Sequence, residues 1–540
     1  MFLIHSKKLP NFPKHCFLFW LVLLLIQNTV PQSLFAQCQT LDIDISKKTL
    51  CIGENFDIEV VAPDLEPIWD FCPGDIVEES ASVLQVATLP NSDRSLGMSI
   101  VKSDEGWFGF ATSRDNNSII RFFFGDGVQN PPTLTDNLGN IQSLLNQPSS
   151  IQVFERDGNW YAFVHNWAGK NLVLLSFGNS LSSSPAGEEW VSNIGASNSF
   201  LDIAITEDSV TAIVTNSNAT LSIVNIPSQL DTKPSITDRI EIGTLTGVNT
   251  LMDIELVNVC GEWYGFAAYL RNQKLFRLNF GITPIKEPVS VIEIANNIFE
   301  DNQPANIEIA RDGEDYIMLV NNINGSLYRA IIGNDITNTV VSTAVDQIGN
   351  GYGVGYNLSV LKDQGDWFGY TINDKNGNLF QTTFPQNCNS SIDYSQSSSI
   401  DGISYNQEGN YQFSAEIIDQ DGSISVKVDS VEVLAQIAPL IDFQLTSQCV
   451  GSTSTVTSTT DQTLSSANWI INSEARSGEI AVYDFPTPGT YEVTLEVEST
   501  NGCGQRLTRE VTIYEPPDPE FSLPAGVICT NGAIALNNLT

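Results

Sequence analysis

A repeat of about 50 residues limits what this chain can fold into. The stretch 261–281, GEWYGFAAYLRNQKLFRLNFG, holds an aromatic residue, an apolar run, a polar turn and a second apolar run that closes on Phe-Gly. The same arrangement recurs, with its first apolar run opened by Trp107, Trp160, Val210, Trp263, Tyr316 and Trp367. The steps between these positions are 53, 50, 53, 53 and 51 residues. Such a regular period indicates one small supersecondary unit that is written six times.

Each repeat contains several strand signals. The first strand alternates polar and apolar residues, as in Asp253-Ile254-Glu255-Leu256, which indicates one wet face. The second strand, which starts at the aromatic position, is apolar on both faces, as expected of a sheet packed between two neighbours. Asn, Asp and Gly fill the turns, as tight hairpins require. The sequence therefore predicts an all-β protein with a six-bladed β-propeller over residues 76–388.

The ends of the repeat region predict how the ring closes. The sixth repeat stops at Phe384-Pro385 without an evident fourth strand. Residues 82–89, SVLQVATL, lie before the first repeat and have the composition of a strand. We expect them to complete the sixth blade, because a ring closed by strands from both ends leaves no exposed sheet edge.

The N-terminus predicts export. Three lysines are followed by the ten-residue apolar run 17–26 and by Ala36, a small residue suited to signal cleavage. Ten residues are too few for a membrane-spanning helix, which needs about 20. Residues 1–36 are therefore expected to be a signal peptide. No later stretch is apolar enough to span a membrane, so we expect a secreted or cell-surface protein.

Charge and histidine content exclude several classes of function. The net charge is −38, and −41 once the three signal lysines are removed. Nucleic-acid binding depends on clustered Lys and Arg, so it is not expected. Without the signal the chain keeps one histidine, His165. A Ser-His-Asp relay would have to use that residue, and a metal site with several histidines is excluded.

The segments that flank the repeats share motifs with a known family. Trp69–Asp75, WDFCPGD, is similar to the WDFGDG signature of PKD (polycystic-kidney-disease) domains, although Cys72-Pro73 stands where that family has glycine. Tyr405–Tyr411, YNQEGNY, is similar to the Y-x-x-x-G-x-Y stretch of the same family. The resemblance implies one immunoglobulin-like β-sandwich in two parts, 37–75 and 389–435, with the propeller inserted between them.

A second copy of the motif follows. Residues 483–491, YDFPTPGTY, match the Y-x-F-x-x-x-G-x-Y pattern of PKD domains, which implies a complete module over 436–514. Residues 515–540 are expected to be a proline-rich linker and the start of a truncated further module, so the sequence has the look of a fragment. The layout resembles surface proteins of bacteria with type IX secretion.

Eight cysteines remain after the signal, in a setting where disulfides persist. Within the PKD-like layout we expect Cys449 to pair with Cys503 and Cys72 to pair with Cys388, the latter clamping the entrance and exit of the ring. The pairing of Cys38 and Cys51 stays open. Cys260 has no evident partner and is expected to be a buried free thiol, and Cys529 would have lost its partner.

The polar residues of the first strands are the best candidates for a site. They are Asp202, Asp253, Asn306 and Asn357 at one level of the channel, with Glu255 and Glu308 two residues further along. Oxygen-rich rings suit Ca²⁺, so calcium at Asp202 and Asp253 is one expectation, and a merely solvated channel is the alternative. In the loop 349–356, GNGYGVGY, Tyr352 and Tyr356 are suited to stack on a sugar or grip a peptide, unless they pack on the rim.

These features favour a non-catalytic exported protein that acts in adhesion. In that hypothesis the propeller binds a glycan or a surface protein, and the PKD-like modules are monomeric spacers. One alternative is a polysaccharide-acting enzyme with two carboxylates at the channel mouth, roughly 5–9.5 Å apart. Another alternative is a purely structural spacer.

Overall fold

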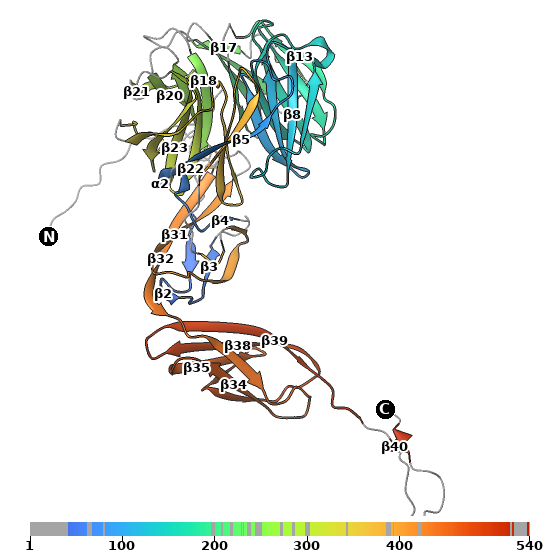
Figure 1. Ribbon diagram of the computed structural model, residues 1–540, viewed down its shortest axis with the longest axis vertical. Coiled ribbons are helices and arrows are strands. Elements are labelled where there is room, and N and C mark those ends of the chain that lie inside the picture. The colour runs from blue at the N-terminus through green and yellow to red at the C-terminus, as the bar shows by residue number, and fades with distance from the viewer. Residues whose placement is uncertain are drawn as a thin grey trace, which may run out of the picture.

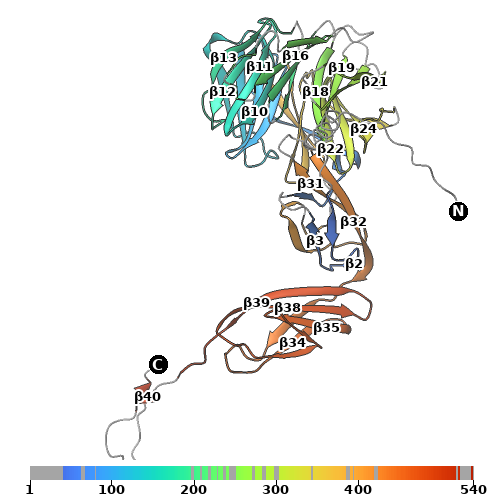
Figure 2. The same ribbon diagram turned by 180° about the vertical axis from the view of Figure 1, so that it is seen from behind.

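The structure is a computed structural model. It describes residues 41–61, 67–78, 81–195, 200–206, 209–216, 220–227, 229–230, 232–234, 239–242, 251–269, 274–282, 287–296, 303–341, 344–384, 390–392, 394–418, 424–518, 521–522 and 537–538. Nearly all ordered elements in this part of the chain are strands, which confirms the all-β prediction. Figures 1 and 2 show a large body of sheets followed by two smaller sandwiches in a row. The predicted signal 1–36 and Cys38, Cys388 and Cys529 lie outside the described residues.

The repeat region forms six four-stranded antiparallel sheets. The first three sheets are β6 (Met98–Ser103), β7 (Gly106–Ser113), β8 (Ser118–Gly125) and β9 (Leu134–Gly139); β10 (Pro148–Arg156), β11 (Asn159–Asn166), β12 (Asn171–Gly178) and β13 (Ala186–Ser192); and β14 (Leu201–Ile205), β15 (Ser209–Thr215), β16 (Leu221–Pro227) and β17 (Arg239–Ile242). A 3₁₀ turn, η1 (Ile141–Ser143), links the first two.

The next three sheets repeat the same order. They are β18 (Leu251–Val259), β19 (Glu262–Tyr269), β20 (Lys274–Gly281) and β21 (Ser290–Asn296); β22 (Pro304–Asp312), β23 (Asp315–Asn322), β24 (Ser326–Gly333) and β25 (Val345–Asn350); and β26 (Ser359–Asp363), β27 (Asp366–Ile372), β28 (Asn378–Thr383) and β5 (Ser82–Thr88). The last strand, β5, comes from before the first repeat and pairs antiparallel with β28; Figure 1 labels β5 within the body of sheets. The prediction that residues 82–89 complete the sixth sheet is confirmed.

Apolar side chains fill the space between successive sheets. The second strand of each sheet is buried on both faces, and separate hydrophobic clusters join sheets one to two, two to three, three to four, four to five and five to six. A further cluster joins sheet six to sheet one, where the rings of Tyr370 and Phe124 lie 5.1 Å apart. Each first strand also contacts the next, and β26 contacts β6. The last sheet therefore packs on the first.

Strands from both sides of the repeats form one sandwich. One sheet has the order β1 (Ile43–Ile45), β3 (Phe56–Val60), β30 (Ser399–Ile403), and the other the order β2 (Thr49–Ile52), β32 (Ile424–Ile437), β31 (Gly409–Ile418), β4 (Ile68–Asp70), β29 (Tyr394–Gln396). Trp69, Phe56 and Phe413 are fully buried between the sheets. Its core therefore needs residues that are more than 300 positions apart in the sequence.

A second sandwich follows directly. Its sheets are β33 (Ile441–Leu445), β34 (Ser454–Thr460) and β37 (Ile480–Tyr483), and β36 (Glu474–Ser477), β35 (Leu464–Ile471), β38 (Gly489–Ser499) and β39 (Gly504–Ile513). Trp469 lies at the centre, and its indole N–H donates to Gly478 O at 2.8 Å. The last two strands, β40 (Phe521–Ser522) and β41 (Asn537–Asn538), pair with each other.

Buried charges seat the first sandwich on sheets five and six. The Asp70 carboxylate, at the end of β4, pairs with Lys362 of β26. The Asp312 carboxylate, at the end of β22, accepts hydrogen bonds from Gly74 N at 3.0 Å and Ile76 N at 2.9 Å, where the short helix α2 (Asp75–Glu78) begins. The WDFCPGD segment thus forms the joint to the repeat region, beside β22 in Figure 1.

The cysteine pairing differs from the prediction. Cys503 pairs with Cys51, so the disulfide joins the two sandwiches, and Cys449 is free. The expected Cys449–Cys503 pair is wrong because the β38–β39 turn that carries Cys503 lies against β2 of the first sandwich. Cys260 is disulfide-bonded, so the expectation of a free thiol is also wrong. Cys72 is disulfide-bonded as well, and its pairing with Cys388 stays a prediction.

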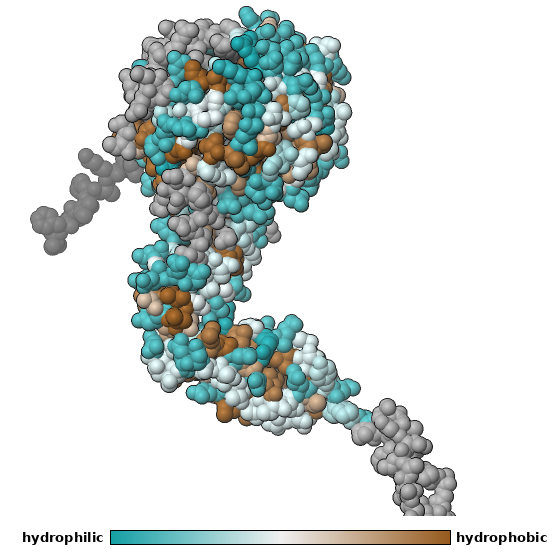
Figure 3. All heavy atoms as spheres, in the orientation of Figure 1, coloured by the Kyte–Doolittle hydropathy of each residue, from teal (hydrophilic) through white to brown (hydrophobic). Residues whose placement is uncertain are grey.

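The surface is mainly polar. Figure 3 shows hydrophilic and neutral residues over most of this face, with apolar patches on the body of six sheets and near the joint of the two sandwiches. Ile437 and Leu440, at the passage from one sandwich to the next, are among the exposed apolar residues. No helix within the described ranges is long and apolar enough to cross a membrane.

Candidate functional site

Five of the predicted site residues, Asp202, Asp253, Glu255, Asn306 and Glu308, lie on the first strands of sheets three to five, and Asn357 lies two residues before the first strand of sheet six. Because side chains alternate along a strand, residues two apart share a face. Asp253 and Glu255 therefore share one face of β18, and Asn306 and Glu308 share one face of β22. These first strands contact one another in order, which brings the polar residues of successive sheets close together.

Two of the predicted carboxylates hold neighbouring strands. Asp202 Oδ2 accepts a hydrogen bond from Leu256 N of the next sheet at 2.7 Å. Asp253 Oδ2 accepts one from Ile307 N of the following sheet at 2.9 Å and another from Asn306 Nδ2 at 2.7 Å. Each carboxylate thus satisfies a backbone donor that would otherwise be buried unpaired. Asp202 and Asp253 are structural cross-links in this fold.

Asn357 lies two residues before the first strand of the sixth sheet. Its Nδ2 donates to Ser95 O, which lies just before the first sheet, at 3.1 Å. Its Oδ1 accepts from Ile372 N at 2.8 Å, and the residue is buried. The amide therefore links sheet six to sheet one and is not free to hold a ligand.

Glu255 and Glu308 are not used in this way to the same extent. Glu308 accepts a hydrogen bond from Val360 N, and Glu255 makes none with any described residue. Both side chains are partly accessible to solvent although protein surrounds them on all sides, as expected of groups that line an internal channel. Glu308 thus also links its strand to the next sheet, and Glu255 is the acid that makes no such link within the described residues.

The acids share one electrostatic environment. Burial raises the pKa of Asp202 to about 7 and raises the pKa values of Asp253, Glu255 and Glu308. The neighbouring carboxylate of Glu308 further raises the pKa of Glu255. Like charges that share a low-dielectric site cannot all ionise, so at least one of these groups keeps its proton at neutral pH.

The described residues do not supply a set of ligands for the expected calcium ion. Among the described residues, no three or more His, Cys, Asp or Glu side chains are placed to hold a metal ion. Ca²⁺ takes six to eight oxygen ligands. Asp202 and Asp253 instead each use a carboxylate oxygen to accept a hydrogen bond from a backbone N–H group.

The two loop tyrosines have different surroundings. Tyr352 is buried, and its hydroxyl lies 2.6 Å from Thr382 Oγ1, so its ring offers no surface to a ligand. Tyr356 is half-buried and packs with Trp167 against Leu96 and Phe200. The loop thus contributes one packing residue and one residue at the edge of a small apolar cluster.

The one histidine of the described chain lies in the core. His165 is fully buried, and its ring nitrogens contact Ser149 Oγ at 2.9 Å and Ile194 O at 3.2 Å. Burial lowers its pKa to about 4. Ser149 is fully buried too, so no substrate reaches this pair.

A hollow between the first two sheets was not predicted from the sequence. It has a volume of about 600 Å³ and is lined by Lys102, Ser103, Asp104, Glu105, Glu155, Gly158, Trp160 and Asn179. The sequence signal for the hollow is Glu155, an acidic residue on the first strand opposite Trp160.

Comparison with known proteins gives limited matches. No family model matches the sequence, and no curated protein matches it. Among solved structures, the PKD1 domain of Vibrio anguillarum Epp is 23% identical, covers 15% of this chain and 96% of its own, and has a TM-score of 0.14. The extracellular domain of a one-component system from B. thetaiotaomicron is 10% identical, with 86% of this chain and 62% of that chain covered and a TM-score of 0.31.

A glycoside hydrolase is also among these structures. An exo-beta-1,3-galactanase from Phanerochaete chrysosporium is 9% identical, with 81% of this chain and 94% of that chain covered and a TM-score of 0.35. This finding contradicts the prediction that the protein is not an enzyme, which is therefore withdrawn. The TM-scores of these three structures all lie below 0.5.

Proposed function

We propose that this chain is an exported, polysaccharide-acting hydrolase with its site on the axis of a six-bladed β-propeller. Two immunoglobulin-like modules of the PKD type, the first in two parts around the propeller, carry it as a stalk. The packing of sheet six on sheet one supports the ring, since six sheets in a row would leave those two faces apart. The pairing of β3 and β4 with β30 and β31 supports the split module.

Disulfide chemistry supports export. Cys51 and Cys503 are bonded to each other, and Cys72 and Cys260 are each disulfide-bonded. Structural disulfides persist in oxidising compartments and are rare in the cytosol. We therefore place the protein outside the cytoplasm.

The observation that carries the proposed activity is the pair Glu255 and Glu308. These carboxyl groups lie on adjacent first strands; Glu308 accepts a hydrogen bond from Val360 N of the next sheet, and Glu255 makes none with any described residue. Hydrolysis of a glycosidic bond needs one protonated carboxyl group as general acid and one carboxylate as base or nucleophile. Two acids whose environment separates their protonation states meet that requirement at neutral pH.

In this mechanism the protonated member of the pair donates its proton to the glycosidic oxygen. The ionised member activates water or attacks the sugar carbon. Desolvation keeps the first group protonated, and mutual repulsion keeps both from ionising at once. Asp253, which lies beside the pair, holds the geometry through its bonds to β22.

The test measures the release of reducing ends from a panel of neutral and acidic polysaccharides by the full chain. We expect Glu255→Gln and Glu308→Gln each to lower turnover at least 100-fold. Glu314→Gln removes one acid from the turn of the fifth sheet and should keep full turnover. Absence of hydrolysis on every polysaccharide, or full activity of both Gln variants, would refute the proposal.

A further inference from the structure

The repeat places a cation over its aromatic residue in three of the six sheets. The first strand pairs Lys102 with Trp107, Arg311 with Tyr316 and Lys362 with Trp367. The cationic groups lie 5.4, 5.0 and 5.4 Å from the respective ring centroids. These three rings are 7%, 5% and 8% exposed. In these sheets the chain itself supplies a cation to the ring face.

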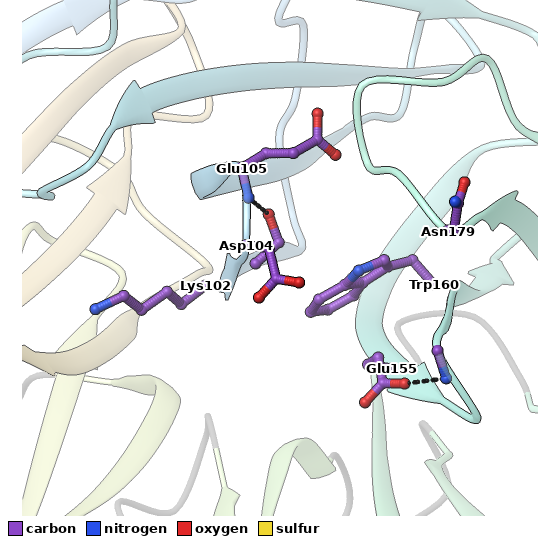
Figure 4. Close-up of a pocket in the computed structure, with 8 residues that line it drawn as sticks. Lys102, Asp104, Glu105, Glu155, Trp160 and Asn179 are labelled. Carbon is purple, nitrogen blue, oxygen red and sulfur yellow. Dashed lines mark hydrogen bonds between the residues drawn. The ribbon is translucent and has the colours of Figure 1, made fainter.

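The second sheet breaks this rule. There Glu155 stands opposite Trp160 at the same register position. Trp160 is partly exposed, and within the described residues no lysine or arginine lies over its ring. Figure 4 shows Asp104, Glu155 and Asn179 set around this ring, with the ammonium group of Lys102 pointing away from it. We call this hollow the Trp160 pocket.

The charges of the pocket are not neutralised from within. Asp104 and Glu155 are exposed, and the Asp104 carboxylate bonds to no described residue. Hydrogen bonds from Ser180 and Ser182 lower the pKa of Glu105, so this carboxyl is ionised too. Lys102 is directed to Asp363, 3.5 Å away, and to Trp107. The pocket thus combines an aromatic face with three carboxylates and lacks the cation of its counterparts.

We propose that the Trp160 pocket binds an amino sugar with a free ammonium group, as part of a cationic polysaccharide. The ammonium takes the place that lysine or arginine occupies in sheets one, five and six, between Glu155 and the ring. The apolar face of the sugar ring stacks on the indole, and Asn179 and Asp104 are placed for its hydroxyl groups. A volume of about 600 Å³ accommodates a sugar ring as well as the ammonium group.

This site is separate from the axial acids and does not depend on the proposed hydrolysis. It lies at the turns between first and second strands of sheets one and two, among residues that the axial pair does not include. Because its assay measures binding alone, loss of activity at Glu255 and Glu308 and loss of binding at Trp160 are distinguishable results.

The experiment is calorimetric titration of the full chain at pH 6 with a glucosamine tetramer and with its fully N-acetylated form. We expect the free amine to bind and the acetylated form to bind at least ten-fold more weakly, because acetylation removes the charge. Trp160→Ala and Glu155→Gln should each weaken binding of the amine at least ten-fold. Glu510→Gln, which removes one exposed acid from β39, should change it less than two-fold and controls for overall charge.

A further variant tests the internal logic. Glu155→Lys restores the pattern of Lys102 and Lys362, so it should fold normally and abolish binding by filling the pocket with its own ammonium group. Equal binding of both tetramers, unchanged binding in Glu155→Lys, or pocket-dependent binding of tetralysine without binding of the sugar would overturn the proposal.

Discussion

Removing the Cys51–Cys503 disulfide should loosen the second sandwich and leave the rest of the chain folded. The disulfide crosses from β2 of the first sandwich to the β38–β39 turn of the second, with the two Cα atoms 5.6 Å apart. Around it, Glu54 accepts hydrogen bonds from Cys51 N at 2.8 Å and Gly504 N at 3.0 Å. Arg506 adds an ion pair to Asp57 at 2.7 Å.

The magnitude depends on which loop the disulfide closes. When only the second sandwich unfolds, the free chain runs from Ala438, which bonds to Ile52 O of the first sandwich, to Cys503. Closing a loop of about 65 residues is worth roughly 4 kcal/mol in the chain-entropy model. The full separation of 452 residues would give roughly 6 kcal/mol, but only if everything between the cysteines unfolded as well. The smaller figure applies.

The assay is hydrogen exchange of the full chain, read at strand β38. In the double variant Cys51→Ser/Cys503→Ser, we expect protection of β38 to fall about a thousand-fold, since about 4 kcal/mol corresponds to about three decades. Cys449→Ser is the matched control, because that thiol is free. The reasoning is refuted if β38 keeps its protection in the double variant, or if Cys449→Ser lowers it equally.

Three further predictions follow from buried polar groups. Burial raises the pKa of Asp202 to about 7, so the unfolded chain releases this proton near pH 4 and the folded chain does so later. The free energy of unfolding therefore falls as the pH rises from about 4 to 7. In Asp202→Asn this fall should be smaller, measured as the urea midpoint at each pH. Lys362→Met leaves Asp70 buried without its cation and should destabilise the joint by about 3–5 kcal/mol, measured by thermal unfolding. Asn357→Ala leaves Ser95 O and Ile372 N without their hydrogen-bond partner. It should lower the free energy of unfolding by about 2–3 kcal/mol, measured by urea denaturation.

The local sequence pattern was sufficient to predict the strands and their order. The aromatic repeat marks the second strand of each sheet because this strand is packed on both faces, and alternation marks the first strand. Residues 82–89 were identified as the missing strand since the sixth repeat lacked one, and β5 fills that place. The period of a repeat, and a sheet edge that lacks its last strand, can both be recognised directly in the sequence.

Contacts between modules were not visible in the sequence. The Cys449–Cys503 prediction treated the second sandwich as a closed unit, whereas the turn carrying Cys503 docks on its neighbour and meets Cys51. Asp70, the acid at the joint between the first sandwich and the repeat region, belongs to a motif that resembles PKD domains. Its ion-pair partner Lys362 lies 292 positions away in the sequence. Pairings of this kind depend on how folded modules meet, which no local pattern encodes.

The alternation of the first strands identified which side chains face the axis but not what they do there. Asp202 and Asp253 have the same pattern as Glu255 and Glu308, yet the shorter side chains reach the backbone N–H groups of the next strand. Glu308, which is one methylene longer, also accepts a hydrogen bond from the next first strand, at Val360 N, whereas Glu255 makes none with any described residue. Asp202, Asp253 and Glu308 therefore link successive first strands, and Glu255 is the acid of this group that makes no such link within the described residues. An Asp253→Ala variant should consequently weaken the contact between β18 and β22, because it leaves Ile307 N buried without its acceptor, and a lower urea midpoint of unfolding would show this.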